Sequence, residues 1–310
     1  NEVHYGFLGR SPDHVASTLA GFYMGLDKFE AYDKARAGAV ADYYRYARDN
    51  DLFLTYTIIN PQGDRTKNPH DQRDEFMTMR VLDRDGEGII VKGAKMLGTS
   101  SIMADEVFVS CIQPLSKGDE VYAVSCMVPM NATGLTIMSR KSYEGDANSV
   151  FDNPLSSRYD ENDAVLYFDE VHISWDRVFV VDNPEMCQRQ LHDTPCYRFE
   201  EYQAVVRLMV KLRFLIAVAR RIAEVNGTVA IQSVRETLGE LASEAATVEA
   251  FVKAIEVNGS LDRNGYYVPD LEMITTCLLY TSDAADDTPC VDLCGRRIFK
   301  KKWGGGGGGG

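Results

Sequence analysis

The spacing of hydrophobic residues changes twice along this chain of 310 residues, and no other feature limits the possible folds as strongly. Between residues 14 and 49, apolar and aromatic side chains recur three or four positions apart, which is typical of amphipathic helices. From residue 52 the pattern becomes short β-type runs between turn signals, and from residue 199 the helical spacing returns. This order predicts an α+β multi-domain protein.

The β-type region consists of short runs separated by turns that contain Gly, Asn or Asp. Short strands at such spacing predict a β-barrel or a sandwich. The predicted strands are 52–60, 76–82, 88–96, 106–112, 121–128, 135–139, 164–171 and 178–181.

The helical region after the strands indicates the start of a bundle. A short helix is predicted at 184–192, and two long helices at 199–225 and 232–256 both end at an Asn-Gly pair. Consecutive long helices are typical of a helical bundle, of which we expect the remaining helices to be missing. The predicted domains are the end of an N-terminal helical domain (1–50), a central β domain (51–182), the first bundle helices (183–276) and a tail (277–310).

The tail, residues 277–310, is interpreted as non-native. It ends in an unbroken run of glycines, 304–310, directly after Lys-Lys-Lys-Trp. The string CLLYTSDAAD (277–286) back-translates to a sequence that resembles a sequencing-library adapter. The alternative is an unusual natural or engineered tail. Because the chain begins with Asn1 rather than Met, we expect the other residues to come from inside a longer, interrupted protein.

Charge and composition disfavour several classes of partner. The chain carries 46 acidic and 33 basic residues, a formal net charge of −13, which argues against nucleic acid or an anionic membrane. No apolar run reaches the length of about 18 residues that a membrane helix needs. Seven cysteines without CxxC pairs indicate thiols in a reducing compartment, so we expect a cytoplasmic location. The five histidines have no metal-ligand spacing, and no metal site is expected.

Three polar motifs are candidates for chemistry. The turn GRSPDH opens a predicted helix and can direct Arg10 and His14 towards a polar ligand, or it can be a capped helix with a surface ion pair. The segment Tyr56–Arg65 is a strand running into a polar loop, which can hold a planar heterocycle or a phosphate, or can be an ordinary strand exit. Thr99 lies among small hydroxyl residues after a strand and can bond a ring nitrogen or the local backbone.

A charged loop at 151–163 precedes a predicted strand. Arg158 can pair with the acidic residues at 160–163 and hold the loop in place. We therefore expect this loop to be structural.

Taken in order, six strings resemble the flavin-dependent aromatic hydroxylase family of 4-hydroxyphenylacetate 3-monooxygenase oxygenase components. Each string is weak alone, but the ordered set at natural spacing is specific and covers residues 6–270. The resemblance implies an acyl-CoA-dehydrogenase-like fold with a helical N-terminal domain, a central β-barrel and a truncated C-terminal helical bundle. The strings are GRSPDH (9–14), INPQGDR (59–65), KGAKMLGTSS (92–101), ADEVFV (104–109), FDNPLSSR (151–158) and WDRVF (175–179).

The resemblance implies the oxygenase component of a two-component monooxygenase. A separate flavin reductase delivers reduced FAD, dioxygen adds to it to form a flavin hydroperoxide, and one oxygen atom is transferred to the ring of a phenol. The implied substrate is 4-hydroxyphenylacetate or a simple or halogenated phenol. The full-length protein is expected to be a homo-oligomer, a tetramer or a dimer.

The resemblance also implies roles for individual residues. Arg10 and His14 face the phenol oxygen, Arg10 stabilising negative charge and His14 bonding or accepting the proton. Tyr56 replaces a His that contacts substrate and flavin in better-known relatives, which leaves open which group is the base. His192, just before the long helix, is a second candidate base or a solvated loop histidine. The implied flavin contacts are Tyr56, Thr57, Ile58, Gln62, Gly63, Asp64, Arg65 and Thr99.

Two residues bear on the substrate. Ile112 and Gln113 fall where hydroxyl groups hold the substrate carboxylate in a hydroxyphenylacetate enzyme. An apolar side chain and an amide there make a simpler phenol comparably plausible.

Two alternatives stay open. A flavin-dependent acyl-CoA dehydrogenase or a 4-hydroxybutyryl-CoA dehydratase-like enzyme has the same fold, although the dehydratase cluster needs Cys and His ligands that the sequence does not place near Arg10 or Tyr202. The other alternative is an inactive fragment, because a half-bundle exposes a large apolar face.

Overall fold

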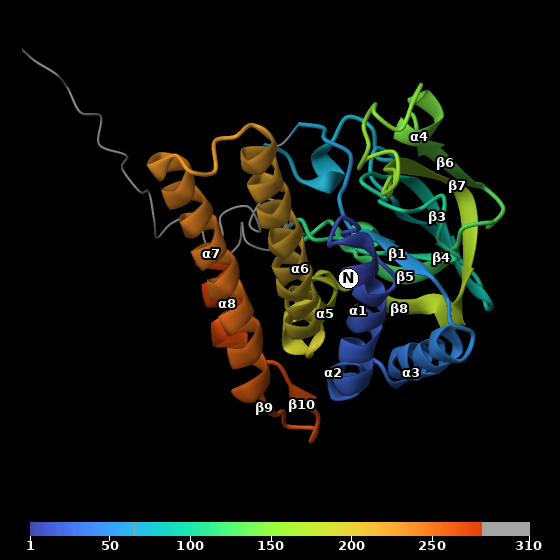
Figure 1. The fold of residues 1–310 in the computed structure, drawn as a ribbon. Helices are drawn as coiled ribbons and strands as arrows, with labels where there is room; N and C mark the ends of the chain where they lie inside the picture. The colour runs from blue at the N-terminus through green and yellow to red at the C-terminus, as the bar shows by residue number, and fades with distance from the viewer. Residues whose placement is uncertain (65, 281–310) are drawn as a thin grey trace, which may run out of the picture.

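The computed structural model describes residues 1–64 and 66–280, in which helices pack on two β-sheets (Figure 1). Helices α1 and α2 meet at Gly25, which packs against Thr194 without room for a side chain. Asp33 separates α2 from α3, because its carboxylate accepts hydrogen bonds from the first backbone amides of α3. The predicted N-terminal helical segment is thus three helices: α1 (Asp13–Met24), α2 (Leu26–Tyr32) and α3 (Lys34–Asp49).

The β region forms two four-stranded sheets, and the predicted barrel is not closed. One sheet has the order β1-β4-β5-β8 and the other β2-β3-β7-β6. Within the described residues no ladder joins the two sheets, so each keeps two edge strands. An alternating pattern of side chains predicts individual strands, whereas closure of a barrel depends on hydrogen bonding between the edge strands of the sheets, which the pattern does not reveal. The strands are β1 (Leu54–Thr57), β2 (Arg80–Arg84), β3 (Gly88–Lys95), β4 (Glu106–Val109), β5 (Val124–Pro129), β6 (Leu135–Ser139), β7 (Ala164–Ser174) and β8 (Val178–Val181).

A shared apolar core holds the two sheets together. Along β4, Val107 and Val109 face this core, whereas Phe108 between them packs with helices on the opposite face. Phe22 of α1 and Val40 of α3 belong to that second cluster, as do residues of α5 (Pro184–Asp193). Helices therefore cover the outer face of the β1-β4-β5-β8 sheet, and β1 ends beneath α1.

The C-terminal helices form a third layer. Helices α6 (Cys196–Val225), α7 (Gln232–Val257) and α8 (Leu271–Tyr280) share an apolar cluster, and the ribbon of β9 (Ser260–Leu261) and β10 (Tyr267–Val268) lies between α7 and α8 along the chain. Residues 277–280 of the predicted tail form the end of α8, where Cys277 and Leu278 are buried. Residues 281–310 lie outside the described residues, so the nature of the tail stays a prediction.

The order of elements confirms the predicted succession of helices, strands and helices, while the domain boundaries at residues 50, 182 and 276 stay predictions. Across the two described ranges, none of the helices combines the length and the apolar character needed to cross a membrane.

The contact between α1 and α6 depends on Gly21. A Cβ atom at this position would collide with the backbone nitrogen and Cα of Cys196. We expect Gly21→Ala to lower the free energy of unfolding by about 2 kcal/mol, because the two helices must move apart. Urea denaturation measures the change.

Gly38→Ala is the matched control. A Cβ atom at Gly38, in the middle of α3, meets no other atom within 4 Å. This substitution should raise the free energy of unfolding by up to about 1 kcal/mol, as is usual inside a helix. Equal effects at the two positions would contradict the tight α1–α6 contact.

Candidate active site

Arg10, His14 and Tyr56 lie together where α1 begins above β1. The guanidinium carbon of Arg10 is 4.7 Å from the centroid of the Tyr56 ring. The rings of His14 and Tyr56 stack with centroids 5.2 Å apart. The three residues that the sequence singled out as catalytic candidates are therefore neighbours, although 46 positions separate Arg10 from Tyr56 in the chain.

His14 is buried and held from the side of α6. Its Nδ1 lies 3.3 Å from Oε1 of Gln203. Burial, and then the positive charge of Arg10, lower the pKa of His14 from 6.5 to about 3. Among the described residues its Nε2 has no hydrogen-bond partner. His14 is thus a neutral imidazole with one nitrogen committed to Gln203.

The backbone of Arg10 is anchored to the loop before β7. Its amide donates a hydrogen bond to Oε1 of Glu161 at 2.5 Å. Two positions later, Asp163 accepts a hydrogen bond from the Thr99 hydroxyl at 2.6 Å. One short segment therefore positions both Arg10 and Thr99.

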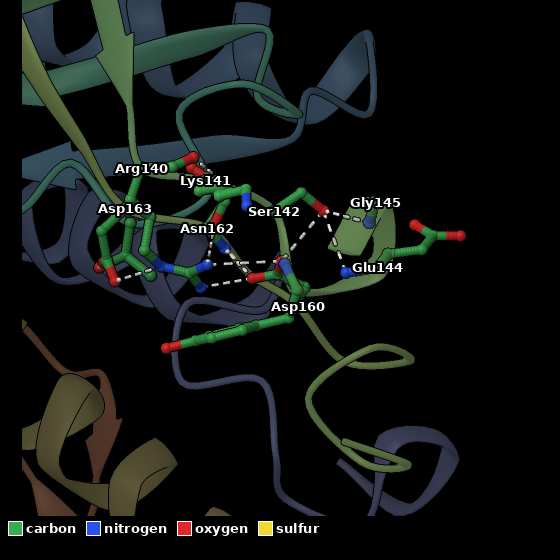
Figure 2. A network of polar contacts seen from close by, with 10 residues as sticks. Arg140, Lys141, Ser142, Glu144, Gly145, Asp160, Asn162 and Asp163 are labelled. Atoms are coloured by element: carbon green, nitrogen blue, oxygen red, sulfur yellow. Dashed lines mark hydrogen bonds and ion pairs between the residues drawn. The ribbon is translucent and has the colours of Figure 1, made fainter. Parts of the chain in front are cut away.

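Arg140 at the end of β6 holds that segment in place. Figure 2 shows its guanidinium between Asp160 and Asp163, bonded to the carboxylate of Asp160 and 3.7 Å from that of Asp163. Asp160 also accepts from the backbone amides of Tyr143 and Asn162 at 2.8 and 3.0 Å. The loop is structural, as predicted, but its cation is Arg140 rather than the expected Arg158.

Arg10 and Thr99 line one polar cavity of about 300 Å³ between the N-terminal turn, this loop and α6. Thr99 donates to Asp163, so the lone pairs of its hydroxyl are available to a ligand. Cationic side chains outnumber carboxylates in its lining, a composition that suits an anionic ligand. Its polar lining consists of Arg10, Thr99, Arg140, Tyr159, Glu161, Asp163, Arg207 and Lys211.

The other predicted flavin contacts surround the end of β1. The hydroxyl of Thr57 donates to the backbone oxygen of Met96 at 2.9 Å, and both Thr57 and Ile58 are buried. Beyond them, the backbone amide of Asp64 bonds to Gln72, and Gly63 packs against Met77. Gln62 lies in the same partly described loop, and Arg65 lies outside the described residues. Their contact with flavin stays a prediction.

The remaining candidates lie on neighbouring segments. The backbone amide of Ile112 donates to Ile58, which places Ile112 beside the end of β1, and Gln113 accepts from Gln188 through its backbone oxygen. His192 lies on α5 with its ring 4.8 Å from that of Tyr197, and burial lowers its pKa.

Sequence reasoning missed several polar residues on the buried face of α6. Besides Gln203, Glu200 accepts a hydrogen bond from Thr18 of α1, and burial raises its pKa. Burial also raises the pKa of Glu201 to about 8. Charged residues at inward positions of an otherwise apolar helical pattern were the available signal.

Lys95 on β3 was missed as well. Its ammonium group is buried and bonds to Oδ1 of Asn60 at 2.6 Å and to the backbone oxygen of Ser110 at 2.7 Å. It therefore ties together the loops that follow β1 and β4. In the described part of the chain, no three His, Cys, Asp or Glu side chains are grouped so as to hold a metal ion.

Family models match nearly the whole chain. The 4-hydroxyphenylacetate 3-hydroxylase N-terminal model covers residues 1–180, and the C-terminal model of the same enzyme covers residues 187–288. The chain belongs to the 4-hydroxyphenylacetate 3-hydroxylase family. The family that the motifs indicated is therefore confirmed.

Two members of the 4-hydroxyphenylacetate 3-hydroxylase family show the extent of the match. The 4-hydroxyphenylacetate 3-monooxygenase oxygenase component of Geobacillus sp. (strain PA-9) is 33% identical over 267 residues, which cover 86% of this chain and 54% of that protein. The 4-nitrophenol 2-monooxygenase, oxygenase component, of Rhodococcus sp. is 33% identical over 272 residues, which cover 85% and 51%. The chain spans about half the length of these curated relatives.

Solved structures confirm the predicted acyl-CoA-dehydrogenase-like fold. The oxygenase component of 4-hydroxyphenylacetate 3-monooxygenase complexed with FAD has a TM-score of 0.83 at 31% identity, covering 90% of this chain and 57% of that chain. Acyl-CoA dehydrogenase from Geobacillus kaustophilus has a TM-score of 0.54 at 15% identity, covering 80% and 59%, and shows the fold alone.

The lowered pKa of His14 predicts how stability changes with pH. Between about pH 6.5 and 3 the unfolded chain binds a proton at this residue that the folded chain does not, so folding stability falls as the pH decreases. Between pH 7 and pH 5 the unsubstituted chain should lose about 2 kcal/mol more unfolding free energy than His14→Gln. Urea denaturation at both pH values measures this difference.

His172→Gln controls for the loss of a histidine as such, because His172 lies at an exposed position on β7. Between pH 7 and pH 5, His172→Gln should lose as much unfolding free energy as the unsubstituted chain. If His14→Gln and His172→Gln lose the same unfolding free energy between pH 7 and pH 5, His14 is not a buried, neutral imidazole in the folded chain.

Proposed function

We propose that this chain is part of the oxygenase component of a two-component monooxygenase, which hydroxylates a phenol with reduced FAD and dioxygen. The observation that carries the proposal is the meeting of Arg10, His14 and Tyr56, where Arg10 also lines a polar cavity. The names of the relatives support it, since both are oxygenase components that act on a phenolic compound.

The three residues divide the task of handling the phenol oxygen. Arg10 provides a fixed positive charge, which stabilises the negative charge that develops on the phenol oxygen as the ring reacts. His14 is too weak a base to keep a proton at neutral pH by itself, so it acts as a hydrogen-bond acceptor that orients the hydroxyl. Tyr56 forms the wall between them, because it contacts both the guanidinium and the imidazole.

The residues around the cavity fit a flavin dinucleotide. Arg207 and Lys211 provide cations for its phosphates, and the Thr99 hydroxyl is directed by Asp163 so that it can accept a hydrogen bond from the ring system. A volume of about 300 Å³ accommodates part of FAD. When bound, reduced FAD supplies the activation of dioxygen. The chain itself binds the two reactants, orients them and excludes water.

The substrate is proposed to be a phenol whose ring substituent need not be a carboxylate. Ile112 is apolar and Gln113 offers an amide, so neither provides the hydroxyl group that holds the substrate carboxylate in a hydroxyphenylacetate enzyme. 4-Hydroxyphenylacetate and simple or halogenated phenols are the candidates. The 4-nitrophenol 2-monooxygenase relative supports a substrate without that group.

A separate flavin reductase is the proposed source of reduced FAD, as the term oxygenase component in the names of the relatives suggests. We also propose a homo-oligomer, tetramer or dimer, for the full-length protein. A cytoplasmic location is supported by five free, buried cysteines among the described residues: Cys111, Cys126, Cys187, Cys196 and Cys277.

A second candidate is an inactive fragment. The apolar side chains of Leu215, Ile222 and Val225 on the C-terminal half of α6 are exposed, as expected for a helix that lacks part of its bundle. This candidate predicts that the chain binds reduced FAD weakly or forms no hydroxylated product.

Arg10→Gln tests the proposed role of the guanidinium. With reduced FAD, dioxygen and a panel of phenols, it should lower kcat/KM for hydroxylation about 100-fold, because it removes the charge that stabilises the negative charge developing on the phenol oxygen. Chromatography of the products measures the rate. Arg45→Gln, at an exposed position in α3, is the control and should leave the rate unchanged.

The outcomes separate the two candidates. Binding of reduced FAD without product from any phenol favours the inactive fragment. Equal rates for Arg10→Gln and Arg45→Gln would remove Arg10 from the mechanism, and no binding of reduced FAD at all would contradict the flavin site.

A further inference from the structure

We propose that Gln203 holds His14 in one neutral tautomer, with the hydrogen on Nδ1, and thereby makes Nε2 a buried hydrogen-bond acceptor selective for a free phenol hydroxyl. Gln203 is a positioning residue on α6, and it acts through His14 on α1. The tautomer follows from the hydrogen bonds of the chain alone. The selectivity for a phenol rests on the proposed function.

The orientation of the Gln203 amide is set by Asp13. Nε2 of Gln203 lies 3.3 and 3.4 Å from the two carboxylate oxygens of Asp13 and 3.4 Å from Oγ of Ser11. The carboxylate only accepts hydrogen bonds, and the Ser11 hydroxyl already donates to it. The NH₂ end of the amide must therefore face Asp13 and Ser11, which turns the carbonyl end towards Nδ1 of His14.

That carbonyl decides which nitrogen of His14 carries the hydrogen. Oε1 of Gln203 is 3.3 Å from Nδ1 of His14, and an amide oxygen can only accept, so Nδ1 must donate. A neutral imidazole has a single N–H, which leaves Nε2 with a lone pair.

Burial and the nearby charges disfavour a second proton on His14, and they outweigh the hydrogen bond to Gln203. The ring is 7% exposed, and the nearby charges that act on it, those of Arg10 and Arg207, are both positive. Among the described residues Nε2 has no hydrogen-bond partner, so its lone pair is a buried acceptor. An unsatisfied buried polar atom is costly, and a ligand that donates to it recovers that cost.

An acceptor in this position distinguishes classes of aromatic ligand. A phenol donates its O–H to Nε2, while its oxygen can face the Arg10 guanidinium, which only donates. The methyl ether of the same phenol has no hydrogen to give and would leave Nε2 unpaired. The opposite tautomer, with a hydrogen on Nε2, would place two donors around the oxygen and favour the ether or the phenolate instead.

The tautomer can be read directly by NMR without flavin or turnover. Long-range ¹H–¹⁵N spectra of the 310-residue chain, labelled with ¹⁵N-histidine and recorded near pH 7, distinguish the Nδ1–H and Nε2–H forms. The His14 signals are those lost in His14→Phe. We expect the Nδ1–H form, although free histidine in water prefers the other.

Gln203→Met removes the acceptor while keeping the length of the side chain. The population ratio of Nδ1–H to Nε2–H should fall about fivefold or more, which corresponds to the loss of one hydrogen bond. Gln190→Met is the matched control, because Gln190 is a buried, hydrogen-bonded glutamine on α5. It should leave the His14 signals unchanged.

Titration of the unsubstituted chain with phenol and with anisole tests the selectivity. Phenol should shift the Nε2 resonance of His14, and anisole should not. An Nε2–H or doubly protonated His14 in the unsubstituted chain overturns the proposal even if Gln203→Met does not fold, and an unchanged tautomer in folded Gln203→Met removes Gln203 from it. The expected tautomer with no response to phenol would contradict the proposed phenol contact while leaving the tautomer intact.

Discussion

The close packing of α1 on the first turns of α6 is the constraint on which the site depends. Gly21 allows the two backbones to touch at Cys196, and polar pairs follow the same seam towards the start of α1. Thr18 bonds to Glu200, and one turn earlier His14 bonds to Gln203. A seam that carried only apolar side chains would hold the helices together but would not orient the imidazole. Here the same interface both packs α1 against α6 and orients the imidazole of His14.

The electrostatics of this interface leave the positive charge of Arg10 poorly neutralised at the proposed phenol site. Burial raises the pKa of Glu201 to about 8 and shifts Glu200 in the same direction, so the acidic side chains of α6 are poor at neutralising Arg10. His14 contributes no charge either, because its pKa is lowered to about 3. A negative oxygen brought into this environment gains the full attraction of the guanidinium in a region with little water.

Periodicity was sufficient to predict the succession of elements and most strands, because alternating residues such as Val107 and Phe108 face opposite sides of a sheet. Closure of a barrel was not predictable, since it depends on pairing between edge strands. The grouping of Arg10, His14 and Tyr56 came from resemblance to a family. The residues that hold them could not be read from local pattern: Gln203 is 189 positions from its partner His14, and nothing in the sequence links Asp163 with Thr99, 64 positions away.

The short segment before β7 has a consequence for how such an enzyme can change over time. Glu161 fixes the backbone of Arg10, and Asp163 fixes the hydroxyl of Thr99, while Arg140 clamps the loop that carries both carboxylates (Figure 2). A substitution that moves this loop displaces the proposed phenol side and the proposed cofactor side together. Under the proposed function, adaptation to a new phenol is therefore easier through residues outside the clamp, such as Ile112, whose side chain can vary without moving Arg10 or Thr99.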